Sequence, residues 1–297
     1  MKCDLCPRKC LVDRKKGEKG ICGQTENLKV ARAALHFWEE PCISGDAGSG
    51  AVFFSGCPLH CVFCQNENIA NGTVGKEISL ERLVDIFLEL QEKRANNINL
   101  VTPGHFVPQI VKALDQARKE GLTLPVVYNT SSYGTVDTIK MLEGYVDIYL
   151  PDFKYMSPVL SKKYSHAPDY AEVAKAAIAE MVRQTGKAVF VNGDEDNLIL
   201  SGTIVRHLTL PGCMADSMQI LKYLHDTYGD MIYISIMNQF TPLSNLEKYP
   251  ELNRRITDEE YETLVDYAIE IGIENGFIQE GNTAEESFIP AFDCEGV

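Results

Sequence analysis

Seven of the ten cysteines lie in two short groups, and this clustering constrains the chain more than any other feature of its sequence. The first group contains four cysteines and the second contains three. Their members are Cys3, Cys6, Cys10 and Cys22 near the start of the chain, and Cys57, Cys61 and Cys64 further on. Scattered cysteines would not be spaced so closely, so we interpret both groups as metal ligands rather than packed thiols. A chain of 297 residues buries a full core, which excludes a disulfide-stapled mini-protein.

The charge of the chain excludes some classes of partner. It has 28 basic and 42 acidic side chains, a formal net charge of −14, which argues against a nucleic acid as the main partner. No apolar run approaches the roughly 20 residues that span a bilayer, and the first residues lack the apolar stretch of a signal peptide. We therefore predict a cytoplasmic protein with reduced or metal-bound cysteines and with neither nucleic acid nor membrane as a partner.

Short β-type runs alternate with helical patterns through most of the chain, which is typical of a parallel sheet built from βα units. We expect strands at 51–55, 98–101, 124–129, 146–150, 203–210 and 231–236. We expect helices from the N-cap Ser79 to about 90, and at 107–119, 135–142, 168–184, 216–228 and 258–271. A hairpin is expected where 189–191 and 204–208 flank the polar turn 192–197. Six βα units predict an α/β fold, a partial (β/α)6 TIM-type barrel.

The chain is expected to divide at residue 45. Residues 46–297 would form the barrel, and residues 1–45 a small cysteine-rich metal-binding segment with its lead-in. The first 35 or so residues contain too few apolar side chains for a core, so a bound metal would supply the missing stabilisation. The spacing Cys3-x2-Cys6-x3-Cys10-x11-Cys22 suits either a structural zinc or a second iron–sulfur cluster, and the sequence does not separate the two.

The second group of cysteines forms a C-x3-C-x2-C loop directly after a predicted strand. Its three thiolates can hold three irons of a [4Fe-4S] cluster and leave the fourth iron without a protein ligand. An open iron can bind the amino and carboxylate groups of S-adenosylmethionine and pass an electron into its sulfonium. A structural zinc with His60 as fourth ligand is the alternative, although zinc sites normally pair their ligands over a longer span.

This loop resembles the signature C-x3-C-x-φ-C of the radical S-adenosylmethionine (radical SAM) superfamily, with Phe63 at the aromatic position φ. Further matches run along nearly the whole chain, at 39–41, 48–50, 53–57, 63–66, 100–103, 152–154, 206–208, 211–212, 279–281 and 288–290. In these stretches the chain is similar to the PflX-like homologues of pyruvate formate-lyase activating enzyme. The resemblance implies bound S-adenosylmethionine, a [4Fe-4S] cluster and a low-potential reductant such as flavodoxin or ferredoxin.

The resemblance also implies cofactor-binding residues at the carboxyl ends of the strands, where parallel barrels place their chemistry. The family's Gly-Gly-Glu-Pro turn is replaced by Thr102-Pro103-Gly104-His105. The acidic residue is missing, so backbone carbonyls and the Thr102 hydroxyl would hold the methionyl amino group, with His105 facing cofactor or substrate. The other implied cofactor-binding residues are Phe63, Thr102, Gly104, Asn129, Ser131, Asp152, Lys154, Arg206 and Gln239.

Cys213 follows Pro211 and Gly212 at the rim of the expected site. A thiol at that place could donate a hydrogen atom or bind a metal. Free cysteine is more commonly a small buried hydrophobe, which is the alternative reading of this residue.

The resemblance predicts an anaerobic oxidoreductase that reductively cleaves S-adenosylmethionine to a 5′-deoxyadenosyl radical. This radical would abstract hydrogen from a protein substrate similar to the glycyl-radical enzymes. Modification of a small molecule or peptide is an alternative in the same chemical class. An electron-transfer module without catalysis is an alternative in another class, and the open three-cysteine site counts against it.

Overall fold

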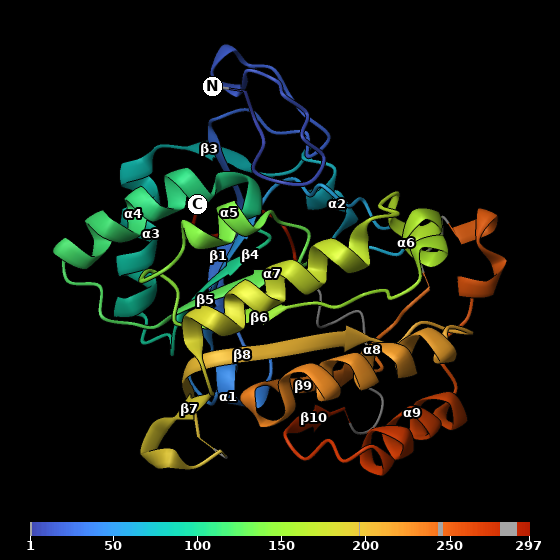
Figure 1. Ribbon diagram of the computed structural model, residues 1–297. Helices are drawn as coiled ribbons and strands as arrows, with labels where there is room; N and C mark the ends of the chain where they lie inside the picture. The colour runs from blue at the N-terminus through green and yellow to red at the C-terminus, as the bar shows by residue number, and fades with distance from the viewer. Residues whose placement is uncertain (1, 196, 243–245, 280–289) are drawn as a thin grey trace.

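The parallel sheet expected from the sequence is present in the computed structural model, which describes residues 2–195, 197–242, 246–279 and 290–297 (Figure 1). Most of two C-terminal stretches of the resemblance, 280–281 and 288–289, lies outside these ranges, as does position 196 of the expected hairpin turn. In the described residues no helix is long and apolar enough to cross a membrane.

The strands form one ten-stranded sheet in the described part of the chain. They are β1 Leu28–His36, β2 Ser49–Phe54, β3 Lys76–Ile78, β4 Ile98–Val101, β5 Val126–Thr130, β6 Ile148–Pro151, β7 Val189–Phe190, β8 Ile199–Leu208, β9 Tyr233–Met237 and β10 Gly276–Ile278. Their order is β10-β9-β8-β6-β5-β4-β2-β1-β3, and β7 pairs with β8 off this path. Neighbouring strands along the path β2-β4-β5-β6-β8-β9-β10 pair in parallel, whereas β1 pairs antiparallel with both β2 and β3. The order is an open path rather than a closed ring, as in a partial barrel.

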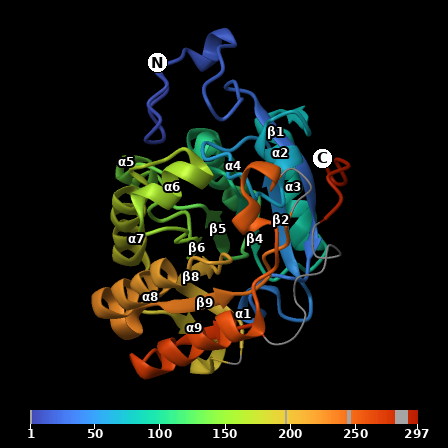
Figure 2. The same cartoon turned by 90° about the vertical axis from the view of Figure 1, so that its right-hand side faces the viewer.

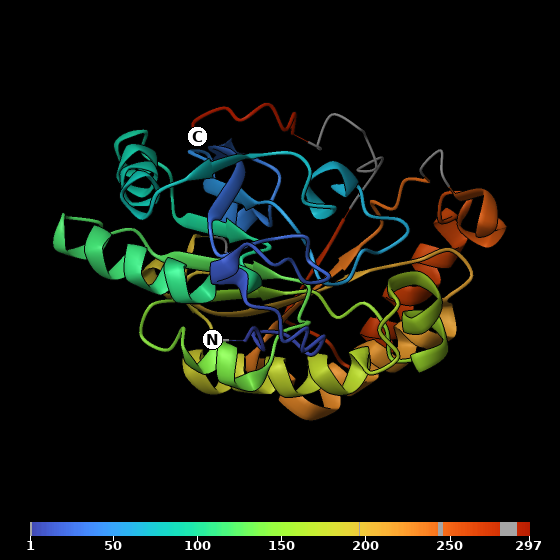
Figure 3. The ribbon, with the colours of Figure 1, turned by 90° about the horizontal axis from the view of Figure 1, so that it is seen from above.

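Helices lie outside the curved sheet, with the strands between them (Figure 3). Their bounds are α1 Pro41–Ser44, α2 Glu67–Ala70, α3 Leu80–Glu92, α4 Val107–Lys119, α5 Val136–Lys140, α6 Pro158–Ser165, α7 Tyr170–Thr185, α8 Met214–Tyr228 and α9 Asp258–Glu270. Strands β2, β4, β6 and β9 are buried along their whole length, as expected when a parallel sheet is covered on both faces.

Helix α3 shows how local sequence sets an element. The Ser79 side chain accepts a hydrogen bond from the Arg82 amide at 3.1 Å, which confirms Ser79 as the N-cap. Leu83, Phe87 and Leu90 recur at helical spacing and are fully or almost fully buried against the sheet. The helix therefore joins the core through the face that the sequence predicts.

The hairpin is present, but the partner of its first strand differs from the prediction. Val189 and Phe190 pair with Ser201 and Ile199, at the beginning of β8, and not with 204–208. Residues 204–208 are already engaged with β9, whose parallel pairing uses that part of β8. The first strand of the hairpin therefore meets β8 nearer to the turn than expected.

Six elements of the described residues were not predicted, namely β1, β3, β10, α1, α2 and α6, and β10 adds a seventh parallel strand to the six expected. Two of the six, β1 and α6, tie the amino-terminal segment to the barrel. Strand β1 extends the sheet on the amino-terminal side of residue 45, so residues from the predicted cysteine-rich segment are hydrogen-bonded to the barrel sheet. The division at residue 45 stays a prediction, with this addition. Helix α6 is the second of these two, and its end is fastened to the amino-terminal segment through Arg8, which donates hydrogen bonds to the carbonyls of Ser165 and His166.

The first 27 residues carry little regular structure and rest on the loops that follow the strands. The Thr138 hydroxyl of α5 donates to the Leu5 carbonyl at 2.8 Å. Figure 2 shows the segment beside α5 and α6. The amino-terminal cysteines are thus placed at the end of the barrel where the sequence predicts the chemistry.

Candidate radical SAM site

The three cysteines of the second group line one cavity of about 260 Å³ at the carboxyl ends of the parallel strands. Cys57, Cys61 and Cys64 lie on the loop between β2 and α2. The Ser165 hydroxyl at the end of α6 donates to the Cys61 sulfur at 3.0 Å. His60 instead has its ring nitrogen 2.8 Å from the Ile21 carbonyl, so its ring is directed to the amino-terminal segment, and the zinc alternative with His60 loses its fourth ligand.

Burial favours the neutral form of two of these thiols, Cys57 and Cys64, unless a cation is bound. Burial raises the pKa of Cys57 to about 11, and the neighbouring Cys61 adds to this rise. Burial raises the pKa of Cys64 as well. Positive iron would reverse this preference, because the thiolate is the form that binds metal.

The spacing of the donor side chains determines which kind of metal centre the cavity could hold. In the described ranges no three side chains among His, Cys, Asp and Glu are grouped to hold a single metal ion. An iron–sulfur cluster makes a different demand, because each cysteine binds its own iron and the sulfurs need not converge on one point. Three cysteines on one cavity wall therefore fit a [4Fe-4S] cluster with one open iron.

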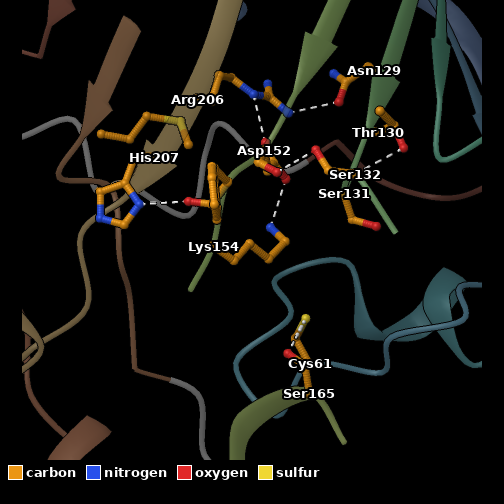
Figure 4. A network of polar contacts seen from close by, with 12 residues as sticks. Cys61, Asn129, Thr130, Ser131, Ser132, Asp152, Lys154, Ser165, Arg206 and His207 are labelled. Carbon is orange, nitrogen blue, oxygen red and sulfur yellow. Dashed lines mark hydrogen bonds and ion pairs between the residues drawn. The ribbon is translucent and has the colours of Figure 1, made fainter. Parts of the chain in front are cut away.

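A network of buried charges forms another wall of this cavity (Figure 4). Arg206 of β8 contacts the Asp152 carboxylate through Nε at 2.9 Å, and Lys154 contacts the same carboxylate at 2.7 Å. Arg206 Nη2 also donates to the Asn129 side-chain oxygen at 2.7 Å. Asn129 lies near the end of β5, Asp152 and Lys154 follow β6, and Arg206 lies inside β8. The fold brings all four together.

Glu39 completes the network, and the sequence did not assign it to the site. Its carboxylate contacts Arg206 Nη1 at 2.9 Å and accepts hydrogen bonds from the amides of Asn99 and Asn129. The available signal was the absence of an acidic residue from the turn at 102–105, together with an acidic pair just after the unpredicted β1. Glu39 thus places a carboxylate in the network, whereas the turn at 102–105 has none.

The charges hold one another ionised. Burial opposes ionisation of Asp152, but Lys154 and Arg206 overcome it, and the pKa of the carboxyl is lowered. Burial likewise opposes protonation of Arg206, but Asp152, Glu39 and Glu40 raise its pKa. Glu40 is fully buried with one oxygen lacking a partner, and burial raises its pKa. The network therefore behaves as one interlocked group of charges.

Thr102 forms part of the cavity wall in a strained backbone conformation. Its φ is +57°, in the left-handed region that β-branched residues rarely adopt. Its amide donates to the Asn129 carbonyl at 2.9 Å, which holds the turn against β5. Strain of this kind collects at functional sites, so the conformation supports a role for this turn.

The other two residues predicted in this turn lie elsewhere. Gly104 and His105 line a second cavity of about 40 Å³, not the first. His105 is buried with one ring nitrogen 2.7 Å from the Ser55 carbonyl, and burial lowers its pKa to about 3. His105 therefore supports the loop after β2 and does not reach the main cavity.

The second cavity is lined by all four cysteines of the first group, Cys3, Cys6, Cys10 and Cys22. Burial raises the pKa of Cys6 to about 11 and also raises that of Cys22. Thr102, Thr130 and Ser131 belong to the linings of both cavities. The two groups of cysteines are therefore on opposite sides of the same strand ends.

The remaining predicted residues divide between cavity and core. Phe63, Ser131 and Gln239 line the main cavity. Cys213 precedes α8, is half-buried against an aromatic cluster and lies outside the linings of both cavities. Burial raises its pKa to about 11. Its place fits a packed thiol better than a hydrogen donor.

Further lining residues were not assigned to the site from the sequence, even where their segment was predicted. His36 and Trp38 enter the cavity from the end of β1, and Gln65 and Met237 enter from the cysteine loop and β9. Trp38 remains 60% exposed, so it offers an aromatic surface at the cavity mouth.

Residues 51–197, which include the three-cysteine loop, match the family model of the radical SAM superfamily. Just under half of the chain is therefore similar to the radical SAM superfamily. This superfamily implies a [4Fe-4S] cluster, S-adenosylmethionine and a reductant. An uncharacterized protein of Methanocaldococcus jannaschii is 27% identical over 275 residues, covering 90% of this chain and 74% of the relative.

Solved radical SAM structures share the fold. Streptococcus suis SuiB bound to the precursor peptide SuiA gives a TM-score of 0.51 at 12% identity, over 75% of this chain and 46% of SuiB. HydG, a maturase of the [FeFe]-hydrogenase, gives 0.51 at 14% identity, over 76% of this chain and 50% of HydG. The chain thus spans about half the length of these two proteins. The partial-barrel prediction is confirmed by these similarities.

Proposed function

We propose that this protein reductively cleaves S-adenosylmethionine and uses the product to abstract hydrogen from a substrate. The observation that carries the proposal is one cavity lined both by Cys57, Cys61 and Cys64 and by the Asp152–Lys154–Arg206 network. A [4Fe-4S] cluster bound by the three thiolates would supply the electron that cleaves S-adenosylmethionine into methionine and a 5′-deoxyadenosyl radical. We also propose that the protein is an oxidoreductase that works anaerobically in the cytoplasm.

The chain's own residues would bind and orient the cofactor. Asp152 takes one of the three N–H donors of Lys154, which leaves donors for the methionyl carboxylate. Arg206 uses three of its five N–H donors on Asp152, Glu39 and Asn129, and Asn129 in turn donates to Glu39, so we assign both a positioning role. Thr102 and Ser131 would offer polar groups to the amino and ribose ends, and Phe63 and Gln239 would border the rest of the cavity.

For the substrate, we propose a protein loop such as that of a glycyl-radical enzyme, as the resemblance to the activases of such enzymes implies. The open strand order supports this, because a sheet that does not close leaves a lateral entrance. Modification of a peptide or small molecule is the second candidate. It is favoured by the exposed Trp38 at the cavity mouth, and the similarly folded SuiB binds a precursor peptide.

The test of cleavage uses anaerobically reconstituted protein with dithionite and S-adenosylmethionine. We expect 5′-deoxyadenosine from the unaltered protein and none from the variant with Cys57→Ala, Cys61→Ala and Cys64→Ala. The control is Cys42→Ala, a buried cysteine outside both cavities, which should retain cleavage. Lack of product at every cluster loading would overturn the proposal. Deuterium transfer from labelled glycyl proteins or from peptides into 5′-deoxyadenosine separates the two substrates.

We propose that the first group of cysteines forms a second metal site, holding zinc or an iron–sulfur cluster. Iron, sulfide and zinc are measured in the triple variant described above, in which the main cluster cannot form. Iron with sulfide in that variant would identify a second cluster, and zinc alone would identify a structural site. Replacing Cys3, Cys6, Cys10 and Cys22 by serine should remove whichever metal is found.

A further inference from the structure

The charge of the chain is unevenly distributed along its length. Residues 1–20 contain seven basic and three acidic side chains, a net charge of +4, so the rest of the chain carries −18. Lys15, Lys16 and Lys19 within this stretch are exposed. A strongly acidic molecule thus presents one basic segment.

This basic segment and the two residues that follow it contact the loop that carries Cys57, Cys61 and Cys64. Arg8 Nε donates to the Pro58 carbonyl at 2.9 Å, and the His60 ring contacts the Ile21 carbonyl at 2.8 Å. The Cys22 carbonyl lies so close to Gly56 that a Cβ there would overlap it. Backbone therefore meets backbone immediately beside Cys57, with no space between the segment and the loop.

Helix α6 adds exposed basic side chains next to the amino-terminal segment. Lys162 and Lys163 are exposed in its last turn, and Val159 on the same helix is 71% exposed. Arg8 joins this helix to the amino-terminal segment through the carbonyls of Ser165 and His166. Ser165 in turn donates to the Cys61 sulfur, so α6 also ends at the cysteine loop.

We propose that residues 1–20 and α6 together form the docking surface for an acidic protein that delivers single electrons. The name basic face is used below for its exposed lysines, Lys15, Lys16, Lys19, Lys162 and Lys163. An acidic carrier is repelled by most of this molecule and attracted to the basic face, which orients it over the cysteine loop. The donor loses one electron and the cluster at that loop gains it, so the step balances without another reactant.

This inference rests on the proposed function, since it assumes a reducible cluster at the three-cysteine loop. It does not depend on which metal the first group of cysteines holds. The overall charge of −14 favours an acidic protein over a nucleic acid as the partner. A long nucleic acid would extend beyond the basic residues and be repelled by the acidic remainder of the surface.

The experiment compares two variants of the full, reconstituted protein. The first carries Lys16→Glu, Lys19→Glu and Lys162→Glu on the basic face. The control carries Lys93→Glu, Lys119→Glu and Lys187→Glu. These lysines are also exposed but lie where α3, α4 and α7 end, at the opposite end of the strands, and two of them hold exposed ion pairs, with Asp115 and Asp230. Each variant changes three charges from +1 to −1 and reaches a net charge of −20, so a difference between them reflects position.

Binding of a flavodoxin with strongly negative net charge is measured first, by the fluorescence anisotropy of its flavin at low salt. Formation of 5′-deoxyadenosine is then measured with that flavodoxin and, separately, with dithionite. We expect the basic-face variant to bind flavodoxin at least about tenfold more weakly and to lose activity with it to a similar degree. The control variant should resemble the unaltered protein, and dithionite-driven cleavage should be equal in all three.

The outcomes distinguish this inference from the proposed function. No product with dithionite in the unaltered protein would overturn the proposed function. With dithionite cleavage intact, equal flavodoxin binding in all three proteins, equal loss in both variants, or tighter binding of RNA than of flavodoxin would overturn the docking surface. If the basic-face variant does not fold, the unaltered protein provides the test, because its affinity for flavodoxin must fall steeply with added salt.

Discussion

At the scale of single residues, the site depends on one buried guanidinium. Arg206 bonds to Glu39, Asp152 and Asn129, which come from the segment after β1, the end of β6 and β5. The residue types at Asn129, Asp152, Lys154 and Arg206 were readable from the sequence, because they lie in predicted strands or follow one closely. Glu39 was not readable, because β1 runs antiparallel and its return into the barrel depends on tertiary packing.

Replacing Arg206 with methionine should be strongly destabilising, because it leaves the Glu39 and Asp152 carboxylates in a buried site without their common partner. Breaking one side of a buried ion pair costs about 3–5 kcal/mol, and we expect a loss of this size in the free energy of unfolding. The measurement is urea denaturation followed by circular dichroism. Lys119→Met removes an exposed pair with Asp115 and serves as the control, with a much smaller loss. Equal losses in the two variants would contradict the network.

At the scale of elements, prediction succeeded where a local signal was complete. The predicted bounds of α4 and of β4 agree with the structure, since a stripe of buried residues in α4 and a fully apolar run in β4 mark each one. Strand β1 lacked such a signal, because its sequence LKVARAALH has three alanines and an arginine and shows no regular alternation. Helix α6 was missed because eight residues give little more than two turns of pattern.

Ser79→Ala tests the cap of α3. Without the hydroxyl, the Arg82 amide loses its partner at the exposed helix start, and we expect about 1 kcal/mol less stability. Urea unfolding of the two proteins measures the difference. Ser79→Asp retains an acceptor at the same place and should remain close to the unaltered protein. A Ser79→Ala protein as stable as the original would show that the cap contributes nothing.

At the scale of the whole molecule, the half-buried His36 and the buried His105 and His207 link stability to pH. Burial lowers the pKa of His36 and His207 to about 4, and that of His105 to about 3. His36 is lowered further by Arg32 and Arg206. Above pH 6.5 these rings are neutral in both the folded and unfolded states and have no effect on stability. As pH falls from 6.5 to about 4, only the unfolded chain takes up the protons, and the folded state is destabilised.

His105→Gln should therefore flatten the fall of stability with acid. Each such histidine contributes a slope approaching about 1.4 kcal/mol per pH unit below pH 6.5. Unfolding free energies measured by urea at pH 7, 6 and 5 should decrease less steeply in the variant. The variant should also take up close to one proton fewer on unfolding at pH 5. An unchanged slope together with unchanged proton uptake would show that the ring is protonated in the fold.

The carboxyl-terminal residues have a consequence for how the molecule meets its own copies. The amide of Ala33 donates to the Glu295 carbonyl, and the amide of Cys294 donates to the Ala31 carbonyl. Arg32 adds ion pairs to Asp293 and Glu295. These contacts occupy backbone groups of β1 beyond its short pairing with β3. An uncovered strand edge is a template on which another chain can add a strand. Residues 293–295 therefore cover this edge of β1 and should reduce its tendency to pair with another copy of the chain.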